Sequence, residues 1–245
     1  MNELFSVSVP EIIAHASSLS VILPLGIYLT RFRRHSRAGH VIGILLVVAA
    51  VCDLTGFILF RAQHSTAVVF NVYYTLMFLL LCRFYYEIFF RYKFRIAIAF
   101  GVATYVLSFV FITFFVQDFS NYQNLIWIIA GVIMILYSIT YFLNSLSALP
   151  NNELFDDSTT WINTGILFYF SFSLFLFSMG DYLFNRQDPQ VTLLLWSTHN
   201  INNTIKNILF AVGLSMTSVN GRPDNVRSRQ SNPAKDFALR SDVLN

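Results

Sequence analysis

Residues 41–60 read VIGILLVVAAVCDLTGFILF, a run that decides the class of this protein and holds a single charged side chain, Asp53. An α-helix needs about 20 consecutive, mostly apolar residues to cross the hydrocarbon core of a bilayer. The rest of the 245-residue chain has the same character, since 56% of its residues are hydrophobic and only 12% are charged. Soluble proteins carry about 25% charged residues. The composition therefore excludes a soluble globular enzyme, a disordered chain, a collagen and a disulfide-rich secreted domain.

Several further segments have the length and apolar character of membrane-spanning helices. Together with residues 41–60, the segments are 12–30, 41–60, 67–90, 96–116, 125–146, 161–184 and 191–216. They lack the alternation of apolar and polar residues that is typical of transmembrane strands, and an open backbone has no hydrogen-bond partner in lipid. We therefore predict an all-α polytopic membrane protein with a seven-helix transmembrane domain over residues 1–217. The polar residues 218–245 are predicted to form a disordered tail.

Lysine and arginine side chains predict the orientation, because they gather in cytoplasmic loops. The loops after the first and third segments and the tail hold Arg31, Arg33, Arg34, Arg37, Arg91, Lys93, Arg95, Arg222, Arg227, Arg229, Lys235 and Arg240. The opposite side has Arg61 and Arg186. We expect the N-terminus outside and the C-terminus in the cytoplasm, in an inner (plasma) membrane, with the first segment retained rather than cleaved. The net charge of +3 follows from these loops and does not indicate nucleic acid as a partner.

The seventh segment contains a run of polar side chains, WSTHNINNTIKN at residues 196–207. Trp196, His199, Asn203 and Lys206 recur at intervals of three and four residues, so they lie on one face of a helix. A lysine at the centre of a bilayer costs about 2.5–3.5 kcal/mol, so this face points into the bundle or toward water. Two interpretations stay open: polar contacts that hold helices together, or the lining of a ligand or ion cavity.

Asp53 is the acid best placed to balance the charge of Lys206. Counted from the cytoplasmic ends of their segments, the two residues lie at similar depths. If the helices form a simple ring, the second and seventh are near neighbours, and we predict that Asp53 and Lys206 pair. Such a pair also has a purely structural interpretation, in which it fixes the register of two helices.

Two histidines complete the predicted site. His15 in the first segment and His199 in the seventh are expected at similar depths near the outer side, where histidines sense protons, bind metal, or simply form interfacial hydrogen bonds. Together with Asp53, Asn203 and Lys206 they make up the predicted ligand or ion cavity. The sequence holds no catalytic, cofactor-binding or metal-ligand motif, so we predict neither an enzyme nor a cofactor.

Three local features give further expectations. Cys52 and Cys82 lie at different depths and are expected to be free thiols. Arg83 and Glu87, four residues apart on one helix, are expected to pair. Pro24 is expected to kink the first helix.

Three stretches carry a resemblance to known proteins: TWINTGILFYFS at 160–171, NNTIKNILFAVGL at 202–214 and NVYYTL at 71–76. They resemble a family of small, largely uncharacterised bacterial seven-helix membrane proteins, and the membrane sensor modules attached to some bacterial histidine kinases. The resemblance covers the whole bundle and implies a sensor or receptor-like module. In that family an acidic residue often follows the tyrosine motif of the third helix, whereas this sequence has Met77 and Phe78 there.

A seven-helix chain with a lysine in its last helix is also similar to microbial rhodopsins, in which that lysine binds retinal. Those proteins carry an aspartate one turn before the lysine, where this sequence has Asn202, so retinal is the less favoured ligand. Three functions remain. The leading one is a sensor that signals to a separate cytoplasmic protein, and the alternatives are a small transporter or channel along Asp53, Asn203 and Lys206, and a structural membrane subunit.

Overall fold

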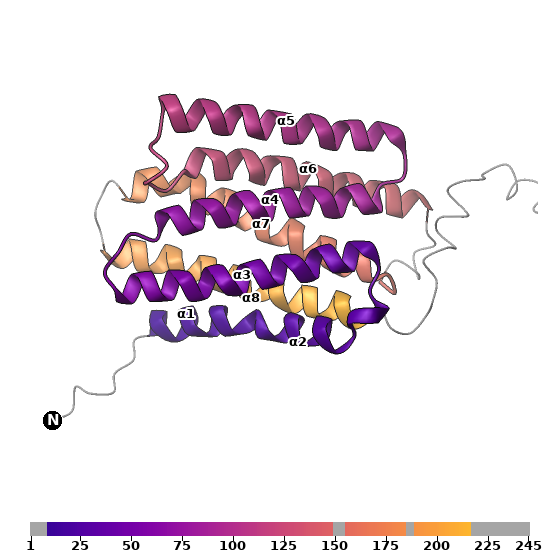
Figure 1. The fold of residues 1–245 in the computed structure, drawn as a ribbon, viewed down its shortest axis with the longest axis horizontal. Helices are drawn as coiled ribbons and strands as arrows, with labels where there is room; N and C mark the ends of the chain where they lie inside the picture. Colours follow the sequence, from indigo (N-terminus) through magenta and orange to yellow (C-terminus); the bar gives the residue numbers. More distant parts are fainter. Residues whose placement is uncertain (1–8, 149–154, 185–188, 217–245) are drawn as a thin grey trace, which may run out of the picture.

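The computed structural model describes residues 9–148, 155–184 and 189–216, and within these ranges it contains helices and no strand (Figure 1). The predicted all-α fold is confirmed. The elements are α1 Val9–Ser20, α2 Ile22–Thr30, the short 3-10 helix η1 Phe32–Arg34, α3 Arg37–Arg61, α4 Ala67–Ile88, α5 Tyr92–Phe115, α6 Asn124–Ala148, α7 Ser158–Phe184 and α8 Pro189–Met216. The predicted tail, residues 218–245, lies outside the described residues.

Within the described ranges, six stretches of helix are long and apolar enough to cross a membrane: Ile12–Thr30, Arg37–Arg61, Ala67–Ile88, Tyr92–Phe115, Asn124–Ser147 and Ser158–Ser178. Their outward surfaces fit the same environment. On α5, for example, Phe100, Phe111 and Phe114 are 60–77% exposed, which water would penalise and lipid does not. The chain is therefore a multi-pass helical membrane protein. Helix α8 is also long, at 28 residues, but it is not one of these six and contains the polar run 196–207.

The first predicted segment is interrupted at Val21, where α1 ends and α2 begins. Pro24 accounts for the interruption, because its nitrogen carries no hydrogen and its ring excludes the carbonyl of residue 20 from the helical ladder. The ladder resumes at Leu25, whose backbone N–H donates to the Val21 carbonyl at 3.2 Å.

The helices follow one another around a ring. Each of α2 to α7 packs against the next helix in the sequence, and α8 closes the ring by packing against both α1 and α2. Helix α4 also packs against α6, and its buried Tyr74, Phe78 and Tyr85 fill the centre of the bundle. In Figure 1 the helices lie side by side with α5 at one edge and α1 and α2 at the other.

One end of the bundle carries most of the described basic residues and is called the basic end here. It holds η1, the turn between α4 and α5, and the last residue of α8, with Arg31, Arg33, Arg34, Arg91, Lys93 and Arg95 (Figure 1, right). Arg31 ties two of these parts together, since its guanidinium donates to the Ser215 carbonyl in the last turn of α8. A cation suits this place, because the end of a helix carries partial negative charge. The other end, with the 62–66 and 116–123 turns, is called the opposite end.

Candidate functional site

Among its residues of described burial, helix α8 carries four buried polar side chains: Ser197, Asn202, Lys206 and Asn207. A buried polar group costs free energy unless it is hydrogen-bonded, and a buried charge costs more. The contacts of these side chains, and of their neighbours His199 and Asn203, therefore define the candidate site.

Lys206 is 5% exposed and is held by neutral groups. Its ammonium Nζ donates to Oδ1 of Asn203 at 2.6 Å. The same nitrogen lies 4.5 Å from the ring centroid of Tyr169 and 6.0 Å from that of Phe210. A desolvated ammonium over an aromatic face gains about 2 kcal/mol, so these contacts offset part of the cost of burial.

Asp53 and Lys206, predicted to pair, form no ion pair within the residues that the structure describes. In the described part of the chain the one ion pair is Arg83–Glu87, which confirms that separate prediction. Asp53 is half-buried on α3, and it interacts with Lys206 electrostatically over a longer distance. The ring explains the separation, because α1 and α2 pack against α8 on its α3 side and α3 and α8 do not pack closely against each other.

Asn203 and Asn207 connect α8 to α1. Asn203 Nδ2 donates to Ser17 Oγ at 3.1 Å, and Asn207 Nδ2 donates to Ser20 Oγ at 2.8 Å. This face of α8 thus fits the helix-joining interpretation. Sequence reasoning missed Ser17 and Ser20, although small polar residues three apart in an apolar helix are typical of such interfaces.

His199 belongs to a second chain of contacts, directed toward the middle of the bundle. Its Nε2 lies 3.3 Å from the Tyr74 hydroxyl, which lies 3.1 Å from the Tyr169 hydroxyl. Asn202 joins the same cluster by donating to the Tyr169 carbonyl at 2.9 Å and to Ser173 Oγ at 3.2 Å. Sequence reasoning missed both tyrosines. Tyr74 stood in the quoted NVYYTL stretch and Tyr169 in the quoted TWINTGILFYFS stretch, but nothing in the sequence indicates that the two side chains meet or that Tyr169 faces α8.

Two polar atoms of this cluster have no partner within the residues the structure describes. They are Nδ1 of His199 and Oδ1 of Asn202, and both are buried. Most buried polar atoms in native proteins are hydrogen-bonded to protein or ordered water. These two atoms are therefore the ones in the cluster that a further hydrogen-bonding group would satisfy.

His15 does not join this cluster. It is exposed on α1, whereas Ser17, two residues later, is the side chain that α1 turns toward α8. No group of three or more metal-ligating side chains occurs within the described residues. Cys52 and Cys82 are free thiols, as predicted.

Between Lys206 and the basic end the bundle is closely packed. A Cβ on Gly213 would lie 2.8 Å from the Ser158 carbonyl oxygen, so α7 and α8 touch through a residue without a side chain. A Cβ on Gly43 would lie 2.2 Å from the ring of Tyr28, which seals α2 against α3. Fully buried apolar side chains fill this half, among them Ile42, Leu46, Ile162, Ile166, Phe210 and Leu214.

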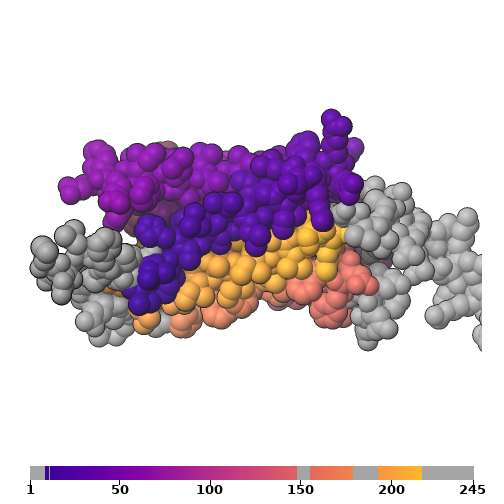
Figure 2. Space-filling model, turned by 90° about the horizontal axis from the view of Figure 1, so that it is seen from below, coloured from indigo at the N-terminus to yellow at the C-terminus, as the bar shows by residue number. Residues whose placement is uncertain are grey.

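The half of the bundle toward the opposite end contains α1 and His199. Helix α2 packs against α3, but α1 does not pack closely against it in the described part of the chain. Figure 2 looks onto this side, where α1 and α2 cross obliquely over α8 (yellow). Toward the opposite end of the bundle, aromatic rings cover His199. The Trp196 ring stands edge-on to the His199 ring with centroids 5.9 Å apart, and the Phe177 ring centroid lies 6.0 Å from that of His199.

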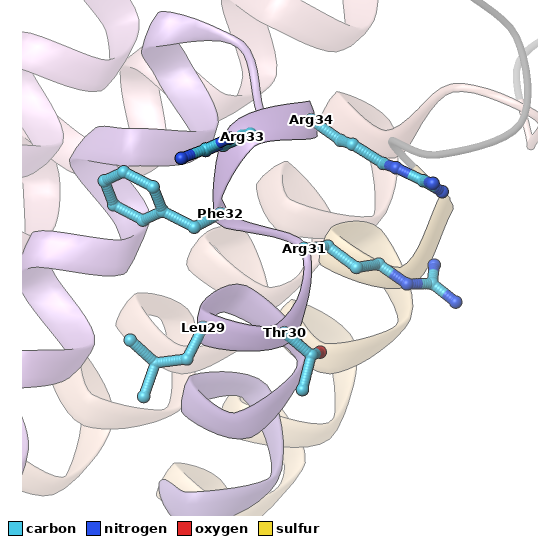
Figure 3. Close-up of a pocket in the computed structure, with 6 residues that line it drawn as sticks. All are labelled: Leu29, Thr30, Arg31, Phe32, Arg33 and Arg34. Carbon is cyan, nitrogen blue, oxygen red and sulfur yellow. The ribbon is translucent and has the colours of Figure 1, made fainter.

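A surface pocket of about 310 Å³ lies at the basic end, around η1. In Figure 3 the side chains of Arg31 and Arg34 point to one side of η1, and those of Phe32 and Arg33 to the other. Guanidinium groups at a membrane edge attract anionic headgroups. Because this is a general property of basic loops, we do not place the ligand site there.

The polar cluster on α8 is therefore the candidate site, with Lys206, Asn203, His199 and Asp53 from the predicted set and Tyr74 and Tyr169 added. Comparison with known proteins adds no further assignment: the chain matches no family model, no curated protein and no solved structure.

Proposed function

We propose that this protein is a seven-helix membrane receptor, with its N-terminus outside, that binds a small ligand at the α8 cluster and signals to a separate cytoplasmic protein. In this proposal α8 is the seventh spanning helix. Its length of 28 residues exceeds the roughly 20 residues that a span requires. The basic end is then the cytoplasmic face, in agreement with the distribution of arginine and lysine.

The observation that carries the proposal is a buried cation in a polar cluster that is closed toward the basic end. A receptor needs a site that a ligand reaches from one side. A transporter or channel needs that polar path to continue, and close packing at Gly213 and Gly43 interrupts it. The transport alternative therefore requires a second conformation in which both glycine contacts separate.

Signalling needs a physical connection from the site to the cytoplasmic face. Helix α8 supplies one, because it carries Lys206 in its middle and accepts the Arg31 hydrogen bond in its last turn. A ligand transmits a signal only if it binds one arrangement of the bundle more tightly than another. A shift of α8 relative to α1 would strain both its asparagine–serine bonds and its Arg31 contact.

The test combines binding with flux. The protein in nanodiscs is screened by thermal unfolding against a defined library of inorganic ions, organic acids, amines and amino acids. Spin labels on η1 and on the last turn of α8 then report the distance between them with each compound that stabilises the protein. The matched variants are Lys206→Met and Lys93→Met, since Lys93 is exposed at the basic end.

We expect at least one compound to raise the unfolding temperature and change the label distance in the wild type and in Lys93→Met, but not in Lys206→Met. Flux of that compound into proteoliposomes should equal that into protein-free liposomes. Flux above this background that Lys206→Met abolishes would establish a transporter. A library without any stabilising compound would favour a structural subunit.

A further inference from the structure

Three aromatic side chains from three different elements meet at the opposite end of the bundle. They are Phe70 of α4, Tyr122 of the turn before α6, and Trp196 of α8. Their ring centroids form a triangle, because each of the three pairs is 6.2 Å apart. The planes of the pairs are inclined by 39°, 45° and 59°, so the rings neither stack nor meet edge to face. Such inclinations are those of the sides of a shallow bowl, and we call these three side chains the aromatic cage.

The turn that carries Tyr122 is fixed to α4 by Asn71, the first residue of the NVYYTL stretch. Asn71 is 1% exposed, and its Nδ2 donates to two carbonyl oxygens of the turn, each at 2.8 Å. Its Oδ1 accepts a hydrogen bond of 3.2 Å from the Gln123 backbone N–H. The Tyr122 hydroxyl lies 2.9 Å from Thr66 Oγ1, at the start of α4. These contacts position the Tyr122 ring, and a site whose groups are already positioned loses less conformational freedom on binding.

A further ring, Trp127, lies behind Tyr122 on the side of the bundle interior. Its centroid is 5.9 Å from that of Tyr122 and 4.4 Å from that of the buried Tyr74, and Trp127 itself is 4% exposed. The cage, by contrast, keeps accessible surface, since Tyr122 is 38% exposed and Phe70 and Trp196 are half-buried. Aromatic side chains are common at the level of lipid headgroups, but that preference alone does not require rings from three elements to meet.

The chemistry of the cage favours a cation. The face of an aromatic ring attracts a cation that lies within about 6 Å of the ring centroid. Because the centroids are 6.2 Å apart, one cation at the mouth of the cage lies within this distance of all three rings.

The polar atoms of the cage indicate which kind of cation fits. The Tyr122 hydroxyl is already engaged with Thr66, and the indole N–H of Trp196 is a donor that accepts no hydrogen bond. A primary ammonium would lose hydrogen bonds to water here without replacement. A quaternary ammonium has no N–H group to satisfy.

We propose that the aromatic cage binds a quaternary ammonium group of the choline type. This group occurs in free solutes and in the headgroup of phosphatidylcholine, and both reach the end of a membrane-spanning bundle. The inference goes beyond the proposed receptor function and does not depend on it, since the cage contains none of the groups that hold Lys206.

The experiment measures binding of choline to the full chain by calorimetry, in nanodiscs of phosphatidylethanolamine and phosphatidylglycerol. Two compounds are matched to choline: its neutral isostere, in which a carbon atom replaces the nitrogen, and ethanolamine, which carries a primary ammonium. We expect both to bind about tenfold more weakly than choline or worse, because the first lacks the charge and the second is left with unpaired donors.

The variants locate the bound group. Tyr122→Leu and Trp196→Leu each remove one ring and should weaken choline binding about threefold or more, whereas Tyr122→Phe keeps the ring and should bind it nearly as the wild type does. Tyr92→Leu is the matched control, since Tyr92 is 78% exposed at the basic end, and it should change nothing. If a leucine variant fails to fold, the comparison of ligands on the wild type still decides.

Three results would overturn the proposal: equal binding of choline and its neutral isostere, wild-type affinity in both leucine variants, or no binding of choline. The source of the group is found by replacing phosphatidylethanolamine with phosphatidylcholine, which has the same net charge. Weaker binding of choline in these nanodiscs supports a cage that takes the lipid headgroup, because the headgroup competes. Unchanged binding supports a cage that takes a free solute.

Discussion

The ammonium of Lys206 donates a hydrogen bond of 2.6 Å to the side-chain oxygen of Asn203, one turn earlier on α8. Asn203 donates in turn to Ser17 on α1 at 3.1 Å. The buried cation is thus positioned by an amide that also joins two helices. As a consequence, any change at Lys206 is transmitted to the contact between α1 and α8.

Asn203→Ala removes both of these hydrogen bonds and should destabilise the protein by about 1–3 kcal/mol, because it leaves a buried ammonium and the Ser17 hydroxyl without their partner. The matched control is Asn200→Ala, three residues away on the same helix and half-buried. The free energy of unfolding in mixed micelles measures both. Equal losses in the two variants would show that the Asn203 contacts contribute nothing specific.

The contact of α7 with α8 depends on the absence of a side chain at position 213. Gly213→Ala places a methyl group 2.7 Å from Ile162 Cγ1 and 2.8 Å from a backbone oxygen, and overpacking of this kind costs about 1–3 kcal/mol. Gly56→Ala is the control, since nothing lies within 4 Å of its added Cβ, and it should be neutral or stabilising. Thermal unfolding compares the two. A Gly213→Ala protein as stable as Gly56→Ala would contradict the sealed interface.

A separate polar group joins α4, α6 and α7 nearer the basic end. The Tyr85 hydroxyl lies 2.6 Å from Ser138 Oγ and donates to Asn163 Oδ1 at 2.7 Å, and Asn163 Nδ2 donates to the Ser138 carbonyl at 3.2 Å. Tyr85→Phe should cost about 1–3 kcal/mol, because it leaves a buried amide oxygen unpaired.

Tyr86→Phe is the matched change at the next, exposed residue. It should leave the midpoint of chemical unfolding close to that of the wild type. Should Tyr85→Phe do the same, the Tyr85 group would not contribute to stability.

His35, between η1 and α3, should make stability depend on pH. Burial lowers the pKa of His35, and the neighbouring His40 and Arg31 charges add to this effect. The unfolded chain then binds a proton near pH 6.5 while the folded protein does not, so stability should fall as the pH drops below about 6.5.

The measurement is the unfolding temperature of wild type and His35→Gln between pH 7.5 and 5. The variant should lose part of the decline at low pH, whereas His64→Gln, at an exposed loop position, should retain it. If the unfolding temperature depends on pH identically in wild type and His35→Gln, His35 does not cause the loss of stability at low pH.

The helices follow from local composition, so the sequence predicts them closely. The segment 41–60 corresponds to α3 Arg37–Arg61, and 67–90 to α4 Ala67–Ile88. The main differences are at the ends. Helix α5 begins at Tyr92 rather than at residue 96, because Lys93 and Arg95 lower the local hydropathy without breaking the helix. Hydropathy indicates which residues lie in the hydrocarbon core of the bilayer, whereas helix α5 continues into the interface between membrane and water.

The site is less predictable, because it depends on which helices meet. The three-residue spacing of Asn203 and Lys206 predicts that they lie on one face of α8, and the structure joins them by a hydrogen bond. No ion pair joins Asp53 and Lys206 in the described part of the chain, where α1 and α2 pack against α8 instead, an arrangement that the apolar pattern of a helix does not encode. Tyr169 was missed for the same reason, since its role comes from facing Lys206 across a helix interface.

Close packing at Gly213 and Gly43 separates the polar cluster on α8 from the basic end, and in the proposed receptor a ligand reaches the cluster from the other face of the membrane. Asp53→Cys, in a Cys52→Ser, Cys82→Ser background, reports the side of access through its reaction with a membrane-impermeant thiol reagent applied to one face of sealed vesicles. We expect modification from the face opposite the basic end, with little from the basic face. Modification from the basic face at an equal or greater rate would contradict the claim.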